Sequence, residues 1–393
     1  MNVLLFFTLT TALVLRAHTR KSLTPGGIFA AILTAFLHGL HPTPTPFLLL
    51  ITFYTLGTLS TKLHHAQKSH LTLSSTGRPI VSRTPIQVFC NSLTASLLTL
   101  LAAALNAAST RAKTEGGYKV FGLPHIPADA ARDAVQLRNA EEVLLFGVVC
   151  HYAATTADTL SSELGILSHS PPRFILSGRV CPKGTNGGVT LTGLLAGALG
   201  AAVIAGVGLM AGMPWWVAAE TRMGFVGVVT AAGIVGSVLD SVLGAVFQET
   251  VVDTRTGKVV EAPGGGKVLV APGERRGSFR GERRAEVGFA PEEDVDKLDT
   301  GTAAGDVGEA GAGESVKRRH ILEDRQEVDM DEKVGRKGRS RSVLTGLGWW
   351  DNNAVNAVMA AGVAVGGMVV VAGWEQVWEA VVKGVGEVGR WIV

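Results

Sequence analysis

The sequence predicts an all-α, polytopic membrane protein: a bundle of about seven or eight transmembrane helices with a disordered cytosolic insert and a C-terminal amphipathic helix. Three observations lead to this fold class. Of 393 residues, 47% are hydrophobic. The apolar residues gather into eight separate stretches, and most charged residues lie between them. This composition is typical of a multi-pass membrane protein and not of a soluble enzyme.

The eight apolar stretches are the predicted membrane helices. They run approximately over residues 2–15, 26–40, 45–61, 86–108, 141–162, 188–212, 215–247 and 353–373. A spanning helix needs about 20 apolar residues, with a range of roughly 17 to 25, so the first two stretches are short and the seventh is long. The first stretch lacks the basic region and cleavage site of a signal peptide, and we interpret it as a retained signal-anchor helix.

Four segments make up the predicted domain organisation. Residues 1–247 form the first part of the bundle (helices 1 to 7), and residues 351–373 complete it. Between them, residues 248–350 combine low hydrophobicity with mixed charge, which predicts a mostly disordered hydrophilic insert. Residues 374–393 carry Trp and Val at helical spacing, which predicts an amphipathic helix in the membrane interface. An ordinary helix packed on the bundle is the alternative.

The distribution of positive charge predicts the orientation. With eight helices, 28 of the 36 lysines and arginines fall on the side that receives the loops after helices 1, 3, 5 and 7. We assign that side to the cytosol. The net charge of +3, without a basic stripe, indicates no nucleic-acid partner. The expected partner is the lipid bilayer, and an endomembrane such as the endoplasmic reticulum is the default location.

Polar residues lie at the predicted cytosolic ends of three helices and in the cytosolic half of a fourth, which carries Asp240. They are ADTLSSELG (157–165), PKGTNGGVT (182–190), Asp240 and WDNNAVN (350–356). We therefore expect them to converge on one membrane face. Each has a structural alternative: Asp158 and Glu163 could face water, Asp240 could be a buried structural acid, and Asp351 could cap a helix. Ionisable groups inside spanning helices are costly, which favours a functional role for Asp240.

The KGTNGG run has the ingredients of a phosphate site. Glycines leave backbone N–H groups accessible, the following helix contributes its positive end, and Lys183 adds a full charge. The run is not a Walker A motif, and by composition alone it is a helix-starting loop. Beside carboxylates, however, it suits phosphoryl transfer, since carboxylates bind Mg²⁺ and Mg²⁺ binds phosphates.

Several motifs together resemble the transmembrane protein 19 family, a group labelled as a domain of unknown function. They are SLTPGG (22–27), FYTLGTLSTK (53–62), IQVFCN (86–91), ADTLSSELG (157–165), PPRFI (171–175), GTNGGVT (184–190), DSVLGAVFQ (240–248), TGKVV (256–260) and DNNAVN (351–356). The chain departs from the family pattern at Leu160 and Ser161, where Trp and Ala are usual, and in the long insert.

The resemblance implies an isoprenyl-phosphate kinase, because the plant members include phytyl-phosphate kinase, which makes a diphosphate with a nucleoside triphosphate. We therefore expect Mg²⁺ and a nucleoside triphosphate as cofactors and an isoprenyl phosphate as substrate. The expected catalytic residues are Asp158, Glu163 and Lys183. The other expected site residues are the metal ligands Asp158, Glu163, Asp240 and Asp351, the phosphate-binding residues Lys183, Gly184, Thr185, Asn186, Gly187 and Gly188, and the polar residues Asn352, Asn353 and Asn356.

Two expectations complete the hypothesis. The prenyl chain should lie between the glycine-rich segments 193–197 and 233–236. The competing class is a non-catalytic membrane protein, either a transporter or a scaffold. A transporter would carry its acids through the depth of the bilayer, whereas an enzyme would gather them at one face.

Overall fold

The computed structural model of the chain describes residues 3–64, 67–68, 70–76, 82–115, 118–120, 123–125, 130–212, 222–270 and 341–391. Each of the eight predicted apolar stretches contains helix in the part that the structure describes. The helices are α1 (Val3–Thr19), α2 (Pro25–Gly39), α3 (Thr45–Lys62), α5 (Pro85–Cys90), α6 (Leu93–Glu115), α7 (Ala130–Gly165), α8 (Leu191–Met210), α9 (Arg222–Phe247) and α11 (Asn352–Trp391). The predicted helix 86–108 is divided into α5 and α6 at residues 91–92.

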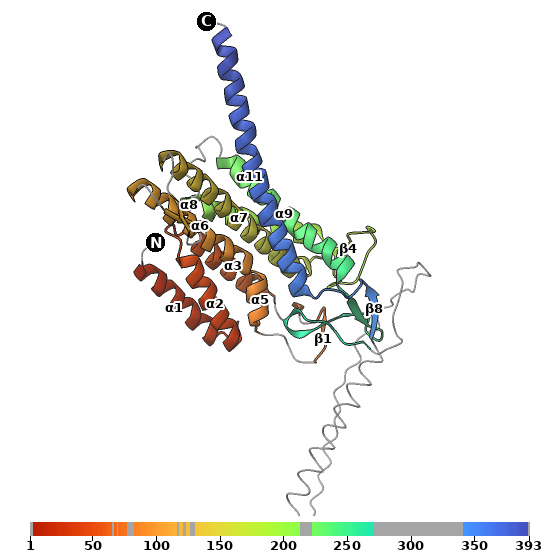
Figure 1. The fold of residues 1–393 in the computed structure, drawn as a ribbon. Helices are drawn as coiled ribbons and strands as arrows, with labels where there is room; N and C mark the ends of the chain where they lie inside the picture. Colours follow the sequence, from red (N-terminus) through yellow and green to blue (C-terminus); the bar gives the residue numbers. More distant parts are fainter. Residues whose placement is uncertain are drawn as a thin grey trace, which may run out of the picture.

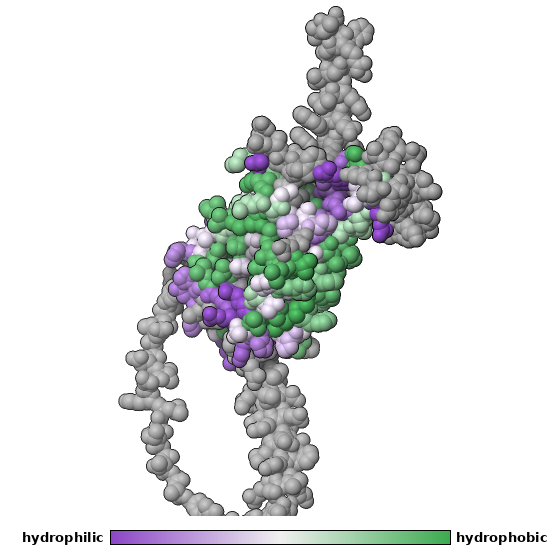
Figure 2. Space-filling view, turned by 90° about the vertical axis from the view of Figure 1, so that its left-hand side faces the viewer, coloured by the Kyte–Doolittle hydropathy of each residue, from purple (hydrophilic) through white to green (hydrophobic). Residues whose placement is uncertain are grey.

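Five of these helices are long and apolar enough to cross a membrane. These spans are Leu93–Ala112, Arg138–Gly165, Leu191–Met210, Arg222–Phe247 and Asn352–Gly373, and α1 and α2 are shorter apolar helices. On the face seen in Figure 2, hydrophobic residues cover the middle of the molecule and hydrophilic residues lie towards its two ends. The polytopic helical membrane fold is confirmed, while the count of seven or eight crossings stays a prediction.

Helix α7 is the centre of the bundle, with α3, α6, α8, α9 and α11 packed around it. Small residues make this close packing feasible. A Cβ added to Gly233 of α9 would lie 3.0 Å from the Ala153 carbonyl oxygen, and one added to Gly236 would lie 2.6 Å from Ala154 Cβ. The α7 side chains Val148, Val149, Ala153 and Ala154 are fully buried as a result.

One end of the bundle carries a four-stranded sheet, visible in Figure 1 beside the start of α11. Its order is β1 (Leu73–Ser74), β7 (Val259–Glu261), β6 (Thr250–Asp253) and β8 (Arg341–Thr345). Strand β1 pairs with β7 in parallel, and β6 is antiparallel to both β7 and β8. Two hairpin-like pairs are smaller: β4 (Arg173–Phe174) with β5 (Gly188–Val189), and β2 (Tyr118–Val120) with β3 (Leu123–His125).

The sheet corrects the all-α prediction. Both described ends of the segment 248–350 form strands, because the valines at 251, 260 and 343 are buried together in a small core of their own, and β-branched residues suit strands. Residues 271–340, on which most of the predicted disordered insert falls, lie outside the described residues.

Helix α11 also differs from its predicted division. It continues from Asn352 to Trp391 across the expected boundary at residue 373. The expected membrane helix and the expected amphipathic helix are thus parts of one helix. The interfacial position of its second part stays a prediction.

The loops after α1, α3, α7 and α9 meet at the sheet end of the bundle. Leu23, after α1, forms a backbone bridge with Arg83, which lies after α3. The backbone N–H of Asn186, after α7, donates to Thr250 Oγ1, after α9, at 3.1 Å. Strand β1, after α3, pairs with β7, after α9. The loops that were predicted to share one side of the bundle therefore lie together in the structure.

Candidate functional site

A polar cavity of about 560 Å³ opens at the sheet end of the bundle. Helices α7, α9 and α11, the 182–190 loop and the turn after β7 all contribute to its lining. Twelve of the expected site residues line it: Asp158, Glu163, Lys183, Gly184, Thr185, Asn186, Gly187, Gly188, Asp240, Asp351, Asn352 and Asn356. Sequence segments that are far apart thus converge on one cavity.

Asp158 and Asp240 form the centre of the acidic part. They come from neighbouring helices, α7 and α9, and their side chains are hydrogen-bonded to each other. With the Asn356 amide nitrogen turned towards it, Asp240 Oδ1 also accepts a hydrogen bond of 3.0 Å. Ionised carboxylates only accept hydrogen bonds, and two of them in contact repel each other. The pair therefore requires a proton or a cation between its oxygens.

Glu163 has a different environment from the aspartate pair. Its Oε2 accepts a hydrogen bond of 2.7 Å from Lys68 Nζ, which also donates to the Ser60 carbonyl at 2.6 Å. The Lys68 side chain is only 11% exposed, so this ion pair is shielded from solvent. Glu163 neutralises and orients Lys68, and the pair lines the cavity as a unit.

The four predicted carboxylate ligands do not form one metal cluster. In the described part of the chain, no group of three or more His, Cys, Asp or Glu side chains is placed to hold a metal ion. Asp351 caps α11, because its Oδ1 accepts from the Ala354 N–H at 2.9 Å. The cap interpretation of Asp351 is therefore correct, and the acidic centre consists of Asp158 and Asp240.

The glycine-rich loop uses most of its backbone groups internally. The N–H groups of Thr185, Asn186 and Gly188 donate to Pro182 O, Thr250 Oγ1 and Thr185 O. The Asn186 amide also donates to the Glu249 carbonyl at 3.1 Å. These contacts hold the loop against the sheet. The predicted cradle of five backbone amides is thus mostly replaced by structural hydrogen bonds, although the loop still lines the cavity.

Lys183 lies at the rim of the same loop. Its Nζ donates to the Ser168 carbonyl at 2.8 Å, which leaves its positive charge without an anionic partner in that contact. The lysine lines the cavity, as predicted.

The asparagines of DNNAVN hold other cavity elements in place. Asn352 Oδ1 lies 3.5 Å from Gln248 Nε2, and Asn353 Nδ2 donates to the Gly264 carbonyl at 2.9 Å. Asn353 does not line the cavity itself. It holds the turn η2 (Pro263–Gly265) in place, and the glycines of this turn line the cavity. Of the three predicted asparagines, Asn356 has the most direct contact with the acidic centre.

Arg83 is the main site residue that the sequence did not reveal. One guanidinium nitrogen donates to the Gly57 carbonyl at 3.1 Å and to Thr61 Oγ1 at 3.3 Å. Its pKa is lowered from the ordinary value because its surroundings exclude water, and the charge of Glu163 acts in the opposite direction. An arginine keeps its charge in such a place. Arg83 therefore adds a fixed cation to the cavity.

Two family motifs position Arg83. The backbone N–H of Thr24 donates to the Arg83 carbonyl at 3.0 Å, and a Cβ on Gly27 would lie 2.8 Å from that carbonyl oxygen. A Cβ on Gly57 would lie 3.2 Å from the guanidinium. The glycines of SLTPGG and FYTLGTLSTK thus leave room for this arginine. The sequence signal for Arg83 is its position directly before the Thr-Pro start of a helix and the IQVFCN motif.

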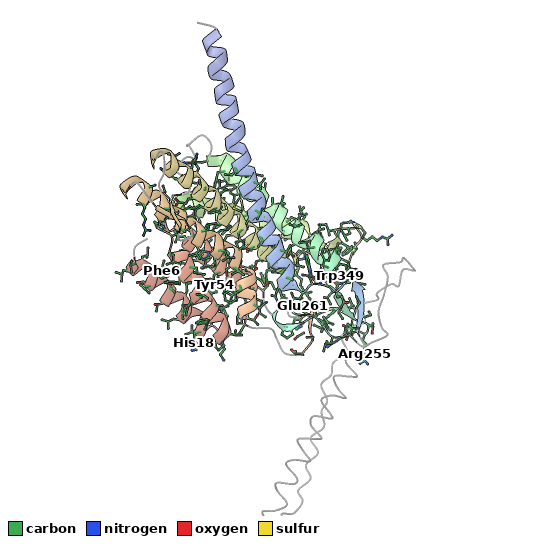
Figure 3. All side chains as sticks on the ribbon, in the orientation of Figure 1. Phe6, His18, Tyr54, Arg255, Glu261 and Trp349 are labelled. Carbon is green, nitrogen blue, oxygen red and sulfur yellow. The ribbon has the colours of Figure 1, made fainter. Side chains whose placement is uncertain are left out.

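The end of β7 and the turn after it supply further cavity residues that the sequence did not reveal. Glu261 and Gly264–Gly266 line the cavity, and Figure 3 shows Glu261 below the start of α11. These residues belong to the hydrophilic segment, whose overall composition concealed them.

The glycine-rich faces of α8 and α9 leave no space for a prenyl chain. A Cβ on Gly193 would lie 2.7 Å from the Ser161 carbonyl oxygen, and one on Gly197 would lie 2.9 Å from that of Ala157. Gly233 and Gly236 are closed by α7 in the same way. The expected chain site between these segments is therefore wrong, because helix packing already fills it.

Comparison with known proteins identifies relatives. Residues 8–364 match the model of a family described as integral membrane protein DUF92. The chain is 33% identical over 267 residues to Protein PGR of Arabidopsis thaliana, an alignment that covers 66% of this chain and 84% of the relative. It is 42% identical over 104 residues to an uncharacterized membrane protein of Methanocaldococcus jannaschii, covering 26% of this chain and 40% of the relative. No solved structure matches.

Proposed function

The chain belongs to the integral membrane protein DUF92 family, and from this premise we propose that it is a Mg²⁺-dependent kinase of an isoprenyl monophosphate. The match agrees with the resemblance carried by the motifs. The observation that carries the proposal is the cavity itself: a hydrogen-bonded aspartate pair, four cationic side chains and a glycine-rich loop meet at the end of a membrane bundle.

The aspartate pair suits Mg²⁺. This ion is usually held by one or two carboxylates together with substrate phosphates and several waters, and not by an all-protein cage. Asp158 and Asp240 already face each other and need a cation or proton between them, so they fit this donor set. When bound there, Mg²⁺ would neutralise phosphate charge. The absence of a third carboxylate in the described cluster is in keeping with a metal shared with the nucleotide.

The cations suit two anionic substrates. Lys68, Arg83, Lys183 and Lys267 lie around one cavity. Lys68 is held by Glu163, and Arg83 is held by the Gly57 carbonyl. Phosphoryl transfer depends mainly on positioning and charge neutralisation. Fixed cations that need no rearrangement provide both.

The reaction needs no strong general base. An oxygen of the lipid phosphate, already anionic, forms a bond to the terminal phosphorus of the nucleoside triphosphate. The bond from that phosphorus to its bridging oxygen breaks, and the nucleoside diphosphate leaves with the electron pair. His151 is not needed as a base. It is fully buried, and its Nε2 lies 2.9 Å from the Asn91 carbonyl oxygen, so its role is structural.

We also propose that the cavity faces the cytosol of an endomembrane such as the endoplasmic reticulum. The positive charges on the sheet side support this orientation. Fluorescence localisation of the tagged protein, followed by protease access to residues of the sheet side in sealed vesicles, tests both parts.

The direct test is turnover by purified protein in lipid nanodiscs with Mg²⁺, a nucleoside triphosphate and phytyl, farnesyl or geranylgeranyl phosphate. We expect the wild type to form the diphosphate and Asp158→Asn or Asp240→Asn to lose on the order of a hundredfold or more in kcat/KM. Glu142→Gln is the matched control, since Glu142 pairs with Arg138 far along α7. No product from the wild type, or equal product from Asp158→Asn, rejects the proposal. Ion uptake by proteoliposomes without product would support a transporter instead.

A further inference from the structure

A second, mainly apolar cavity lies among the N-terminal helices. It has a volume of about 80 Å³ and is lined by residues of α1, α2, α3 and α5. Its apolar lining includes Leu13, Val14, Ile28, Ala31, Leu50 and Ile51. Figure 3 shows Tyr54, which also lines it, within this group of helices. None of the predicted site residues contributes to it.

This apolar pocket adjoins the polar cavity. Arg83, Gln87 and Asn91 line both of them. Arg83 and the start of α5 therefore form the boundary, with hydrocarbon side chains on one side and the acids and lysines on the other. The boundary is fixed, since Thr84 and Gln87 form a capping box and the Arg83 backbone is bonded to Ser22 and Thr24.

The pocket lies next to the lipid-facing surface. Helix α1 forms its outer wall, and the outward side chains Leu4, Leu5 and Phe7 of α1 are exposed. In Figure 1, α1 is the outermost helix of the N-terminal group. An apolar chain can therefore be buried in the pocket while its other end remains in the bilayer.

We propose that this pocket holds the first part of the hydrocarbon chain of a single-chain lipid phosphate, whose phosphate is bound at Arg83. The inference rests on the proposed function for its headgroup and adds the site and the selectivity for the chain. A cavity of about 150 Å³ holds benzene, so a pocket about half that size takes only a few carbon atoms. The pocket therefore selects lipids by the shape of the chain close to the phosphate. It does not select by total chain length, because the rest of the chain lies in the bilayer. A two-chain phospholipid does not fit.

Photo-crosslinking tests the pocket without requiring turnover. Two isoprenyl monophosphate probes are used with wild-type protein in nanodiscs, one with a diazirine near the phosphate and one with a diazirine at the far end. We expect the near probe to label peptides of α1, α2 and α3 that contain pocket residues, and the far probe to label them much less. A neutral alcohol probe with the near diazirine should label them at least about fivefold less.

A filled pocket provides the second measurement. Ala31→Phe places a ring in the pocket and should reduce near-probe labelling at least about fivefold, whereas Ala231→Phe, on an exposed face of α9, should leave it unchanged. Near-probe labelling confined to α8 and α9, or equal labelling by the alcohol, would overturn the inference even if diphosphate forms. Pocket labelling by wild type without diphosphate would support the pocket and reject the kinase.

Discussion

At the scale of single residues, Arg83 connects the parts of the proposed site. Its guanidinium is held by the Gly57 carbonyl and Thr61, and its side chain lines both the polar cavity and the apolar pocket. A fixed guanidinium can bind a phosphate with two parallel hydrogen bonds, which a lysine cannot do. Arg83 is therefore the residue where the headgroup of the lipid is expected.

We predict that Arg83→Gln raises the KM for the lipid phosphate by roughly tenfold to a hundredfold, because hydrogen bonds to a charged group contribute about 1.5 to 3 kcal/mol. Arg83→Lys should recover part of the loss. The KM for the nucleotide should change less. Initial rates at varied lipid phosphate measure this, with Arg255→Gln, an exposed arginine in the turn between β6 and β7, as control. An unchanged lipid KM in Arg83→Gln would remove the arginine from the site.

The sequence predicted which residues meet but not how they pair. Because Asp158, Lys183, Asp240 and Asp351 all fall at helix ends of one side, helix counting was enough to gather them. Pair contacts depend on side-chain directions across segments distant in the chain, such as Lys68 with Glu163. No periodicity encodes such a contact. For this reason the sequence predicted one metal site with four carboxylates. The structure instead has an aspartate pair, Asp158 with Asp240, and a separate ion pair between Glu163 and Lys68.

At the scale of elements, the glycine-rich loop shows why its residues are small. Gly187 has a φ of +79°, and a Cβ there would lie 2.5 Å from Ala245 Cβ and 2.8 Å from the Ser241 carbonyl oxygen of α9. The glycine thus allows both the backbone conformation and the close approach of the loop to α9. The loop packs on that helix one turn after Asp240.

We predict that Gly187→Ala destabilises the folded protein by on the order of 2 to 4 kcal/mol, since a left-handed conformation and overpacking each cost about 1 to 3 kcal/mol. Gly178→Ala is the matched control. Gly178 has a φ of +67° with no atom within 4 Å of an added Cβ, so this substitution should cause only the loss that comes from the left-handed conformation. Thermal unfolding in detergent compares the two. Equal losses would show that contact with α9 contributes nothing.

The strands were missed for a reason that also belongs to this scale. Composition averaged over residues 248–350 is hydrophilic, but β6, β7 and β8 are only 4, 3 and 5 residues long. Short strands become stable by pairing with one another. The partners β1 and β8 are far in sequence from the β6–β7 pair, so no local pattern reveals the sheet. The long apolar helices, in contrast, were predicted well because each carries its own signal.

At the scale of the whole molecule, the segment between β7 and β8 begins and ends at the same place. A guanidinium nitrogen of Arg341 lies 3.3 Å from the Leu269 carbonyl oxygen, and β8 pairs with β6. The fold thus requires that the chain return to this point, whatever the length of the connection.

We predict that replacing residues 271–340 with an eight-residue Gly/Ser linker preserves the fold. A shorter connection has a smaller entropic cost of loop closure. The replacement should therefore stabilise the protein by on the order of 2 kcal/mol or less. Thermal unfolding in detergent measures the change. A second variant that also removes Arg341–Thr345 should lose stability, because β6 then loses one of its two partner strands. A linker variant that fails to fold would show that the replaced residues support the bundle.

Helix α11 has a consequence for how the protein can be studied in cells. Its 40 residues extend about 60 Å by helix rise, roughly twice the thickness of the hydrocarbon core. It starts at the cavity and points away from it (Figure 1). We therefore predict that residues near Trp391 lie at or beyond the membrane surface opposite to the sheet. An antibody, protease or labelling reagent confined to one compartment should then reach only one of these two regions.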